Sequence, residues 1–227
     1  MNKPAASASD VWDLPTRLFH WLLALLIGTA WWTAENGVLV WHRRAGYCVL
    51  ALLLFRVLWG FAGSTTARFA HFVRGPRAVV AYLRELPRRA PRAVIGHNPL
   101  GGWSVVAMLL ALLTQVTLGL FAVDVDGIES GPLSYLVDFD TGRTAAQLHH
   151  VVFNALLALI GLHVIAVLFY LFYKRDNLLG AMIRGHRHLP GLEHIVSQLR
   201  FAPWWRAAAC LMVSAAFVAL LVKGLGR

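Results

Sequence analysis

Charged residues are scarce in this sequence: they make up 14% of its 227 residues, whereas hydrophobic residues make up 58%. A soluble domain needs a polar shell, and this composition supplies too little of one. Acidic residues are the rarer kind, with 11 Asp and Glu against 21 Lys and Arg. The net charge of +10 does not indicate nucleic-acid binding, because long apolar runs separate the basic clusters. We therefore expect an integral membrane protein.

Cysteine is nearly absent as well. Cys48 and Cys210 lie within apolar runs and have neither metal-binding nor disulfide spacing, so we expect them to be packing residues. The sequence has no Cys-x-x-Cys-His motif, which excludes covalent attachment of a c-type haem. It also lacks the period-two alternation of membrane strands, which leaves helices as the spanning elements.

Long apolar runs are abundant. Five of them reach about the 20 residues that a helix needs to cross a bilayer: 14–33, 42–62, 102–123, 146–173 and 205–222. We expect the first run to be retained as an anchor, because no small-residue cleavage pattern accompanies it. Eight tryptophans near the run ends are expected to lie at the membrane interfaces: Trp12, Trp31, Trp32, Trp41, Trp59, Trp103, Trp204 and Trp205. The expected fold class is all-α, an integral membrane helical bundle of four core helices (residues 1–200), with a fifth, C-terminal transmembrane helix (201–227) packed on it.

The loops predict the orientation of the chain. Segments 63–101 and 174–204 carry twelve basic residues and should be cytoplasmic, which also places the N-terminus in the cytoplasm. Arg43 and Arg44 conflict with this assignment, since they open the second run on the expected outer face. The loop 123–145 holds five acids and one arginine and should lie outside. Its acidity either follows from topology alone or attracts a partner with a basic rim.

Histidines interrupt the apolar runs. His149 and His163 are fourteen residues apart, so a helix places them within about 40° of one face and ~21 Å apart along its axis. His150 points about 140° away from His163 and is the weaker candidate. His20 lies in the first run and His42 opens the second. With the predicted orientation, His20 matches the depth of His163, and His42 matches that of His149.

Two imidazoles that face each other at one depth are the axial ligands of a six-coordinate haem iron. The pairs His20/His163 and His42/His149 therefore predict two b-type haems in a four-helix haem-binding core. Taken alone, His42 beside Trp41 also fits an ordinary interfacial residue. A single zinc site is disfavoured, because thiolates and carboxylates are absent at these depths and the histidines are too far apart for one ion.

Arg56 lies fourteen residues after His42, on the same helical face. Two interpretations are open: an ion pair with a haem propionate, or extension of the side chain to the membrane interface near Trp59. The other histidines fall in the expected cytoplasmic segments. His71 and His97 are minor candidates for proton transfer at a quinone site. The remaining ones are expected to be solvated or to contact lipid headgroups: His186, His188 and His194.

Five short motifs between residues 11 and 187 resemble the bacterial cytochrome b561 and nickel-dependent hydrogenase b-type cytochrome family. They are VWDLPTRLFHW, HRRAGY, RVLWGF, GHNPLGG and LHHVVFNALLALIGLH. The resemblance implies two b haems within four helices, with axial ligands at His20, His42, His149 and His163. The run 205–222 departs from that four-helix pattern.

The resemblance also implies a function: electron transfer in the bacterial inner membrane between a periplasmic redox partner and the quinone pool. The partner would be a c-type cytochrome or a hydrogenase-like protein, and quinone would be a further ligand. Two alternatives stay open. One is an enzyme, a superoxide:quinone oxidoreductase, although the acidic outer loop would repel superoxide unless Arg43 and Arg44 form its entry. The other is a cofactor-free membrane transport or assembly protein.

Overall fold

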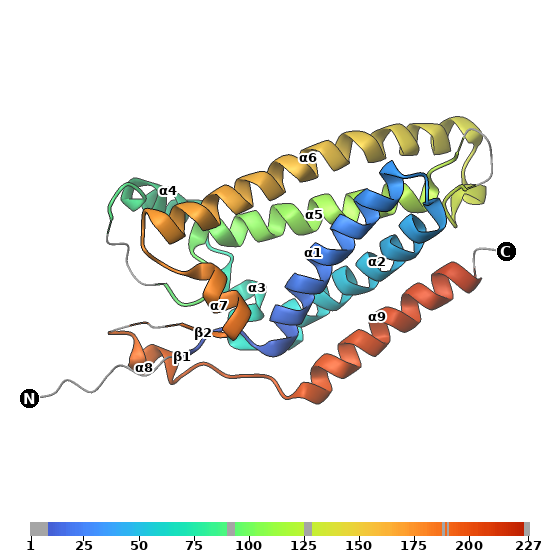
Figure 1. Ribbon diagram of the computed structural model, residues 1–227. Helices are drawn as coiled ribbons and strands as arrows, with labels where there is room; N and C mark the ends of the chain where they lie inside the picture. Colours follow the sequence, from blue (N-terminus) through green and yellow to red (C-terminus); the bar gives the residue numbers. More distant parts are fainter. Residues whose placement is uncertain (1–8, 90–93, 125–128, 188, 190, 225–227) are drawn as a thin grey trace, which may run out of the picture. The chain divides into compact units, whose positions relative to one another are not determined.

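The computed structural model describes residues 9–89, 94–124, 129–187, 189 and 191–224, and long helices dominate it (Figure 1). The elements, in chain order, are β1 (Ser9–Asp10), α1 (Leu14–Glu35), α2 (Leu39–Ala62), η1 (Thr65–Ala67), α3 (Phe69–Phe72), α4 (Pro76–Glu85), α5 (Pro99–Phe121), η2 (Ser134–Leu136), α6 (Phe139–Phe172), α7 (Leu178–Arg184), β2 (His186–Arg187), α8 (Glu193–Val196) and α9 (Trp204–Gly224). The expected all-α membrane bundle is confirmed.

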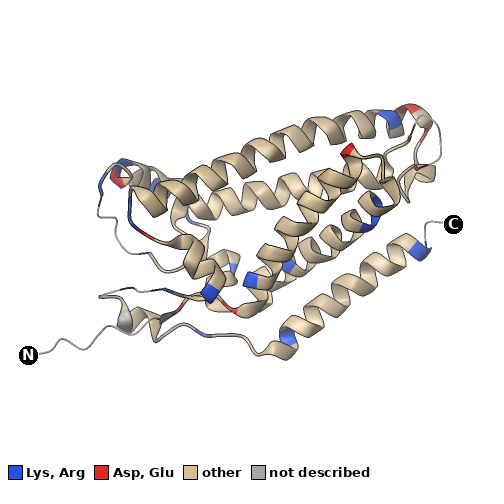
Figure 2. Cartoon of the chain, in the orientation of Figure 1, with Lys and Arg blue, Asp and Glu red and all other residues tan. Residues whose placement is uncertain are grey.

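Four helices among the described residues are long and apolar enough to cross a membrane: α2, α5, α6 and α9. The C-terminal run 205–222 is thus such a helix. The first run forms the 22-residue α1, which is long enough but falls outside this apolar set and contains Arg17, His20 and Glu35. Charged residues lie mostly near the ends of the long helices (Figure 2), and α5 contains none. Large apolar side chains on α6 are exposed, as lipid contact requires.

The chain divides into two compact units. The first comprises Met1–Leu18, Leu58–Val106 and Gly161–Ala207. In it, β1 pairs with β2 in antiparallel register, with Ser9 opposite Arg187. A small core beside this pairing consists of Val11, Trp12, Ala181 and Leu189.

The start of α1 is built into the first unit. Asp13 Oδ1 accepts a hydrogen bond from the Thr16 amide at 2.8 Å, and Asp13 Oδ2 accepts one from Trp59 Nε1 at 3.1 Å. Asp13 is thus an N-cap, and Pro15 fits the first turn because no amide is needed there. Gly185, at φ +91°, accepts hydrogen bonds from the amides of Val11 and Trp12. The WDLPT motif therefore positions the N-terminus of α1.

The second unit comprises Phe19–Val57, Ala107–Ile160 and Ala208–Arg227. Its core cluster joins Leu50 of α2, Leu120 of α5, Leu133 and Val218 of α9. Phe19 of α1 and Phe55 of α2 contact each other with ring centroids 6.4 Å apart. Within this unit α9 therefore packs directly on α2 and α5. The expected domain division at residue 200 stays a prediction.

Candidate functional site

Two of the four candidate histidines lie together in the second unit. The rings of His42, on α2, and His149, on α6, have centroids 6.0 Å apart and planes 78° apart. Both side chains are partly buried. These residues are far apart in sequence and are brought together by the packing of α2 and α6; their pairing as ligands stays a prediction.

Each ring of this pair is oriented by one further helix, α1 for His42 and α5 for His149. His42 Nδ1 lies 2.8 Å from the carbonyl oxygen of Ala30 on α1, and His149 Nδ1 lies 2.9 Å from that of Gln115 on α5. A carbonyl oxygen only accepts, so each Nδ1 carries the proton and donates it. The unprotonated nitrogen of each neutral imidazole is then Nε2, the one available as a metal ligand.

The spacing of the pair fits one iron between two rings. An imidazole nitrogen binds a transition metal at about 2 Å, so two rings on opposite sides of one ion lie about 6 Å apart between centroids. The observed 6.0 Å matches this spacing. Among the described residues, no group of three or more His, Cys, Asp or Glu could hold a metal ion. A haem, which supplies its own equatorial ligands, needs only two protein ligands.

Gly119 and Gln115, both on α5, adjoin the pair and were not identified from the sequence. A Cβ added at Gly119 would lie 3.0 Å from His149 Cε1 and 3.3 Å from its Nδ1, so any larger residue would displace the ring. Gln115 is 9% exposed, and in the described part of the chain its side-chain Oε1 accepts no hydrogen bond. A polar residue within an apolar run was the sequence feature that could have identified Gln115.

The other two candidate histidines belong to different units: His20 to the second, His163 to the first. His20 contacts Trp21 edge-on, with ring centroids 4.9 Å apart. Both histidines are partly buried in their helices. Their pairing stays a prediction.

Arg56 is 2% exposed, although it lies within a membrane-spanning helix. Burial to this degree argues against extension of the side chain to the interface. A buried guanidinium needs an acceptor or an anion beside it. The burial of Arg56 disfavours the interfacial interpretation, and its ion pair with a haem propionate stays a prediction.

Two of the eight tryptophans near the run ends face the protein interior and not lipid. Trp12 is 9% exposed and belongs to the core of the first unit, and Trp59 is fully buried with its Nε1 bonded to Asp13. The indole N–H of a buried tryptophan needs a partner, and Asp13 provides it. These two rings hold the start of α1 in place.

The remaining histidines are not members of this pair. His150 is exposed, and its ring is perpendicular to that of His149. His97 lies between aromatic rings, with its centroid 4.7 Å from those of both Trp12 and Phe72. Burial, followed by the charges of Arg74 and Arg68, lowers the pKa of His71 below its ordinary value. His186 pairs in β2 and His194 contacts Gln198, while His188 lies outside the described residues.

Comparison with known proteins identifies related sequences. The family described as prokaryotic cytochrome b561 matches residues 11–185. A probable Ni/Fe-hydrogenase B-type cytochrome subunit of Azotobacter chroococcum is 24% identical over 215 residues, covering 80% of this chain and 89% of that protein. A protein of the same description from Rhizobium leguminosarum is 22% identical over 209 residues, covering 78% and 87%. No solved structure is significantly similar to this chain.

Proposed function

Since the chain belongs to the prokaryotic cytochrome b561 family, and is thus a membrane b-type cytochrome of electron transfer, we propose that it binds two haems. His42 and His149 would hold one haem, and His20 and His163 would hold the other. The chain lies in the bacterial inner membrane with its N-terminus in the cytoplasm, and it carries electrons between a periplasmic partner and the quinone pool.

The observation that supports this proposal most is the orientation of the His42 and His149 rings. Both donate Nδ1–H to backbone carbonyls, both keep Nε2 for a ligand, and their spacing suits one iron. A backbone hydrogen bond at Nδ1 also raises the basicity of Nε2 and prevents rotation of the ring. The helices α1 and α5 therefore contribute to the site although they supply neither of these two ligands.

A bound b haem supplies a one-electron iron couple. The protein contributes ligation, orientation and charge compensation. Gly119 leaves the space that the His149 ring occupies. Buried Arg56 is suited to compensate a haem propionate, because a buried carboxylate without a partner is costly.

The second haem rests on the depth match of His20 and His163 that the sequence predicts, and the two redox partners rest on sequence similarity. Two related proteins are described as probable Ni/Fe-hydrogenase B-type cytochrome subunits. A hydrogenase-like protein is therefore the first candidate for the periplasmic partner, with a c-type cytochrome as the other. His71 and His97 are candidates for proton transfer at a quinone site. His71 favours the neutral, proton-accepting form because its pKa is lowered.

Superoxide oxidation is the less supported alternative. It would require Arg43 and Arg44 to act together as a cationic entry. Arg43 instead forms an ion pair with Glu129, with Nη2 and Oε2 2.5 Å apart. This ion pair leaves Arg44 as the one arginine of the two whose charge Glu129 does not compensate.

Haem stoichiometry tests the proposal directly. The purified protein should contain two b haems per chain in a pyridine haemochrome assay, and a redox titration should resolve two one-electron steps. One haem per chain, with the protein intact and fully loaded, would overturn the two-haem arrangement. The Cys48→Ser variant is a matched control, because Cys48 is exposed on α2 and is not one of the proposed ligands.

A further inference from the structure

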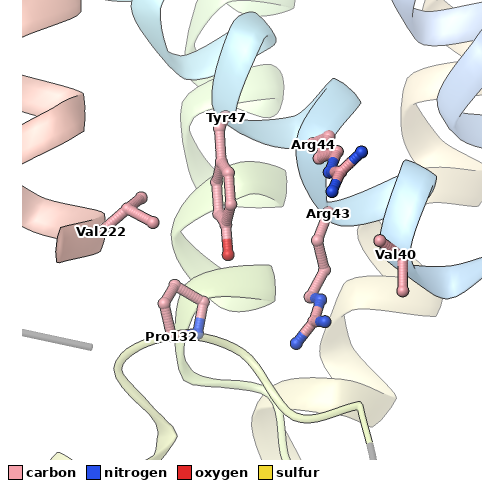
Figure 3. Close-up of a pocket in the computed structure, with 6 residues that line it drawn as sticks. All are labelled: Val40, Arg43, Arg44, Tyr47, Pro132 and Val222. Carbon is pink, nitrogen blue, oxygen red and sulfur yellow. The ribbon is translucent and has the colours of Figure 1, made fainter. Parts of the chain in front are cut away.

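A hollow of about 300 Å³ lies in the second unit where several helices end (Figure 3). Its lining residues are Val40, Arg43, Arg44, Tyr47, Pro132 and Val222. Figure 3 shows the Tyr47 hydroxyl and the Arg43 guanidinium pointing the same way, toward the loop that carries Pro132. Valine and proline side chains form the rest of the wall. The hollow thus combines hydrogen-bond donors with an apolar side.

The polar groups of the hollow are suited to an anion. Arg43 is held by Glu129 and also donates to the Ser130 carbonyl oxygen at 3.2 Å. Arg44 is exposed, and its guanidinium lies over the Trp41 ring, 4.9 Å from the centroid. Two arginines and one glutamate leave a net charge of +1, which one monoanionic group would neutralise.

Tyr47 adds a further donor. Its side chain is partly buried and packs against the core cluster of the second unit. Within the described residues, its hydroxyl makes no hydrogen bond. A tyrosine hydroxyl at such a place ordinarily finds a partner. A ligand oxygen in the hollow would provide one.

The position of the hollow indicates which anion is available. Arg43 and Arg44 lie in the first two turns of α2, and Val222 lies near the end of α9. Both helices are long and apolar enough to span the membrane, so their ends lie at headgroup level. At this level phospholipid phosphates are abundant, and Val40 and Val222 offer contacts to an adjoining glycerol or acyl carbon.

We propose that this hollow binds the phosphate of an anionic phospholipid such as phosphatidylglycerol. Arg44 donates to the phosphate oxygens in the forked geometry that favours arginine, Tyr47 donates its hydroxyl, and Arg43 adds charge. The lipid then contacts both α2 and α9. Helix α9 lies beyond the residues that the family matches. This site is independent of the number of haems, and its occupant is a structural lipid.

Native mass spectrometry of the haem-loaded protein tests the proposal, with phosphatidylglycerol, phosphatidylcholine and inorganic phosphate as probes. We expect one phosphatidylglycerol to bind about tenfold more tightly than phosphatidylcholine, because only the former brings an uncompensated negative charge. Arg44→Gln should lower phosphatidylglycerol binding about tenfold, and Tyr47→Phe several-fold, with unchanged haem absorbance. Equal binding of the two lipids to the unaltered protein would overturn the proposal, whatever the variants do.

Arg206→Gln is the matched control. Arg206 is also exposed and lies over a tryptophan ring, 5.5 Å from the centroid of Trp205, but it does not line the hollow. Its variant should retain full phosphatidylglycerol binding. An equal loss in Arg206→Gln and Arg44→Gln would assign the effect to general surface charge and overturn the site. Displacement of the lipid by millimolar inorganic phosphate would overturn the lipid as the occupant and identify a free anion instead.

Discussion

The imidazole rings of His42 and His149 lie 6.0 Å apart, and each is fixed by a backbone carbonyl of a helix other than its own. Ala30 of α1 orients the first ring, and Gln115 of α5 orients the second. Four helices therefore converge on one pair of side chains. Because of this arrangement, substitutions of single residues at the pair and beside it should have distinct effects on haem binding.

His149→Ala and His150→Ala should differ, although the residues are adjacent. His149 is partly buried and faces His42, whereas His150 is exposed. Removal of His149 should reduce haem content by about one per chain, and removal of His150 should leave it unchanged. The pyridine haemochrome assay measures both. Haem loss from His150→Ala with full content in His149→Ala would show that the ligand assignment is wrong by one residue.

Gly119→Ala should disturb the same haem without removing a ligand. The new Cβ would lie 3.0 Å from His149 Cε1, so the ring must shift, and α5 and α6 must separate slightly if it does not. We expect a changed electron paramagnetic resonance signal of one low-spin haem and partial loss of its occupancy. Gly161→Ala, on α6, is the control, because nothing lies within 4 Å of the added Cβ. Identical spectra for both variants would contradict the close packing.

His20→Ala and His163→Ala should each remove the other haem and largely spare the one at His42 and His149. The two proposed sites share α6 but no ligand, so the remaining site keeps both of its axial groups. Haem content should fall to about one per chain, and the redox titration should lose one step. Retention of two haems in either variant would refute the His20/His163 pair.

Electron exchange with the periplasmic partner should slow as salt rises, if the acidic outer loop docks it. Asp126 lies outside the described residues, Glu129 is occupied by Arg43, and Asp138 caps α6 through Thr141. Neutralisation of Asp124 and Asp140 is therefore the cleaner test. It should reduce the rate at low salt and flatten its salt dependence, since screening acts over about 8 to 10 Å.

The control for this experiment is Asp10→Asn, an exposed acid on β1. Haem content should be the same in all variants, so that only docking is compared. A rate that responds neither to salt nor to the loop substitutions would favour a permanently bound partner, such as a hydrogenase subunit.

The membrane-spanning helices and the candidate histidines could be predicted from the sequence. Apolar length is a local property, so runs such as 102–123 appear as α5 with ends within a few residues. Helical periodicity likewise predicts that His149 and His163 share a face of α6, because 3.6 residues per turn is independent of what surrounds the helix. The capping of α1 by Asp13 is local chemistry of the same kind, although it was recognised only in the structure.

The tertiary structure decided which nitrogen of each histidine can bind a ligand. The protonated nitrogen of His42 depends on Ala30 and that of His149 on Gln115, and both partners come from other helices. The same holds for Trp59, which faces Asp13 instead of the lipid interface, and for Arg43, which Glu129 compensates. Hydropathy and residue spacing depend only on the sequence within one chain segment. Burial, tautomer and ion pairing depend on contacts between segments far apart in sequence, and only packing creates them.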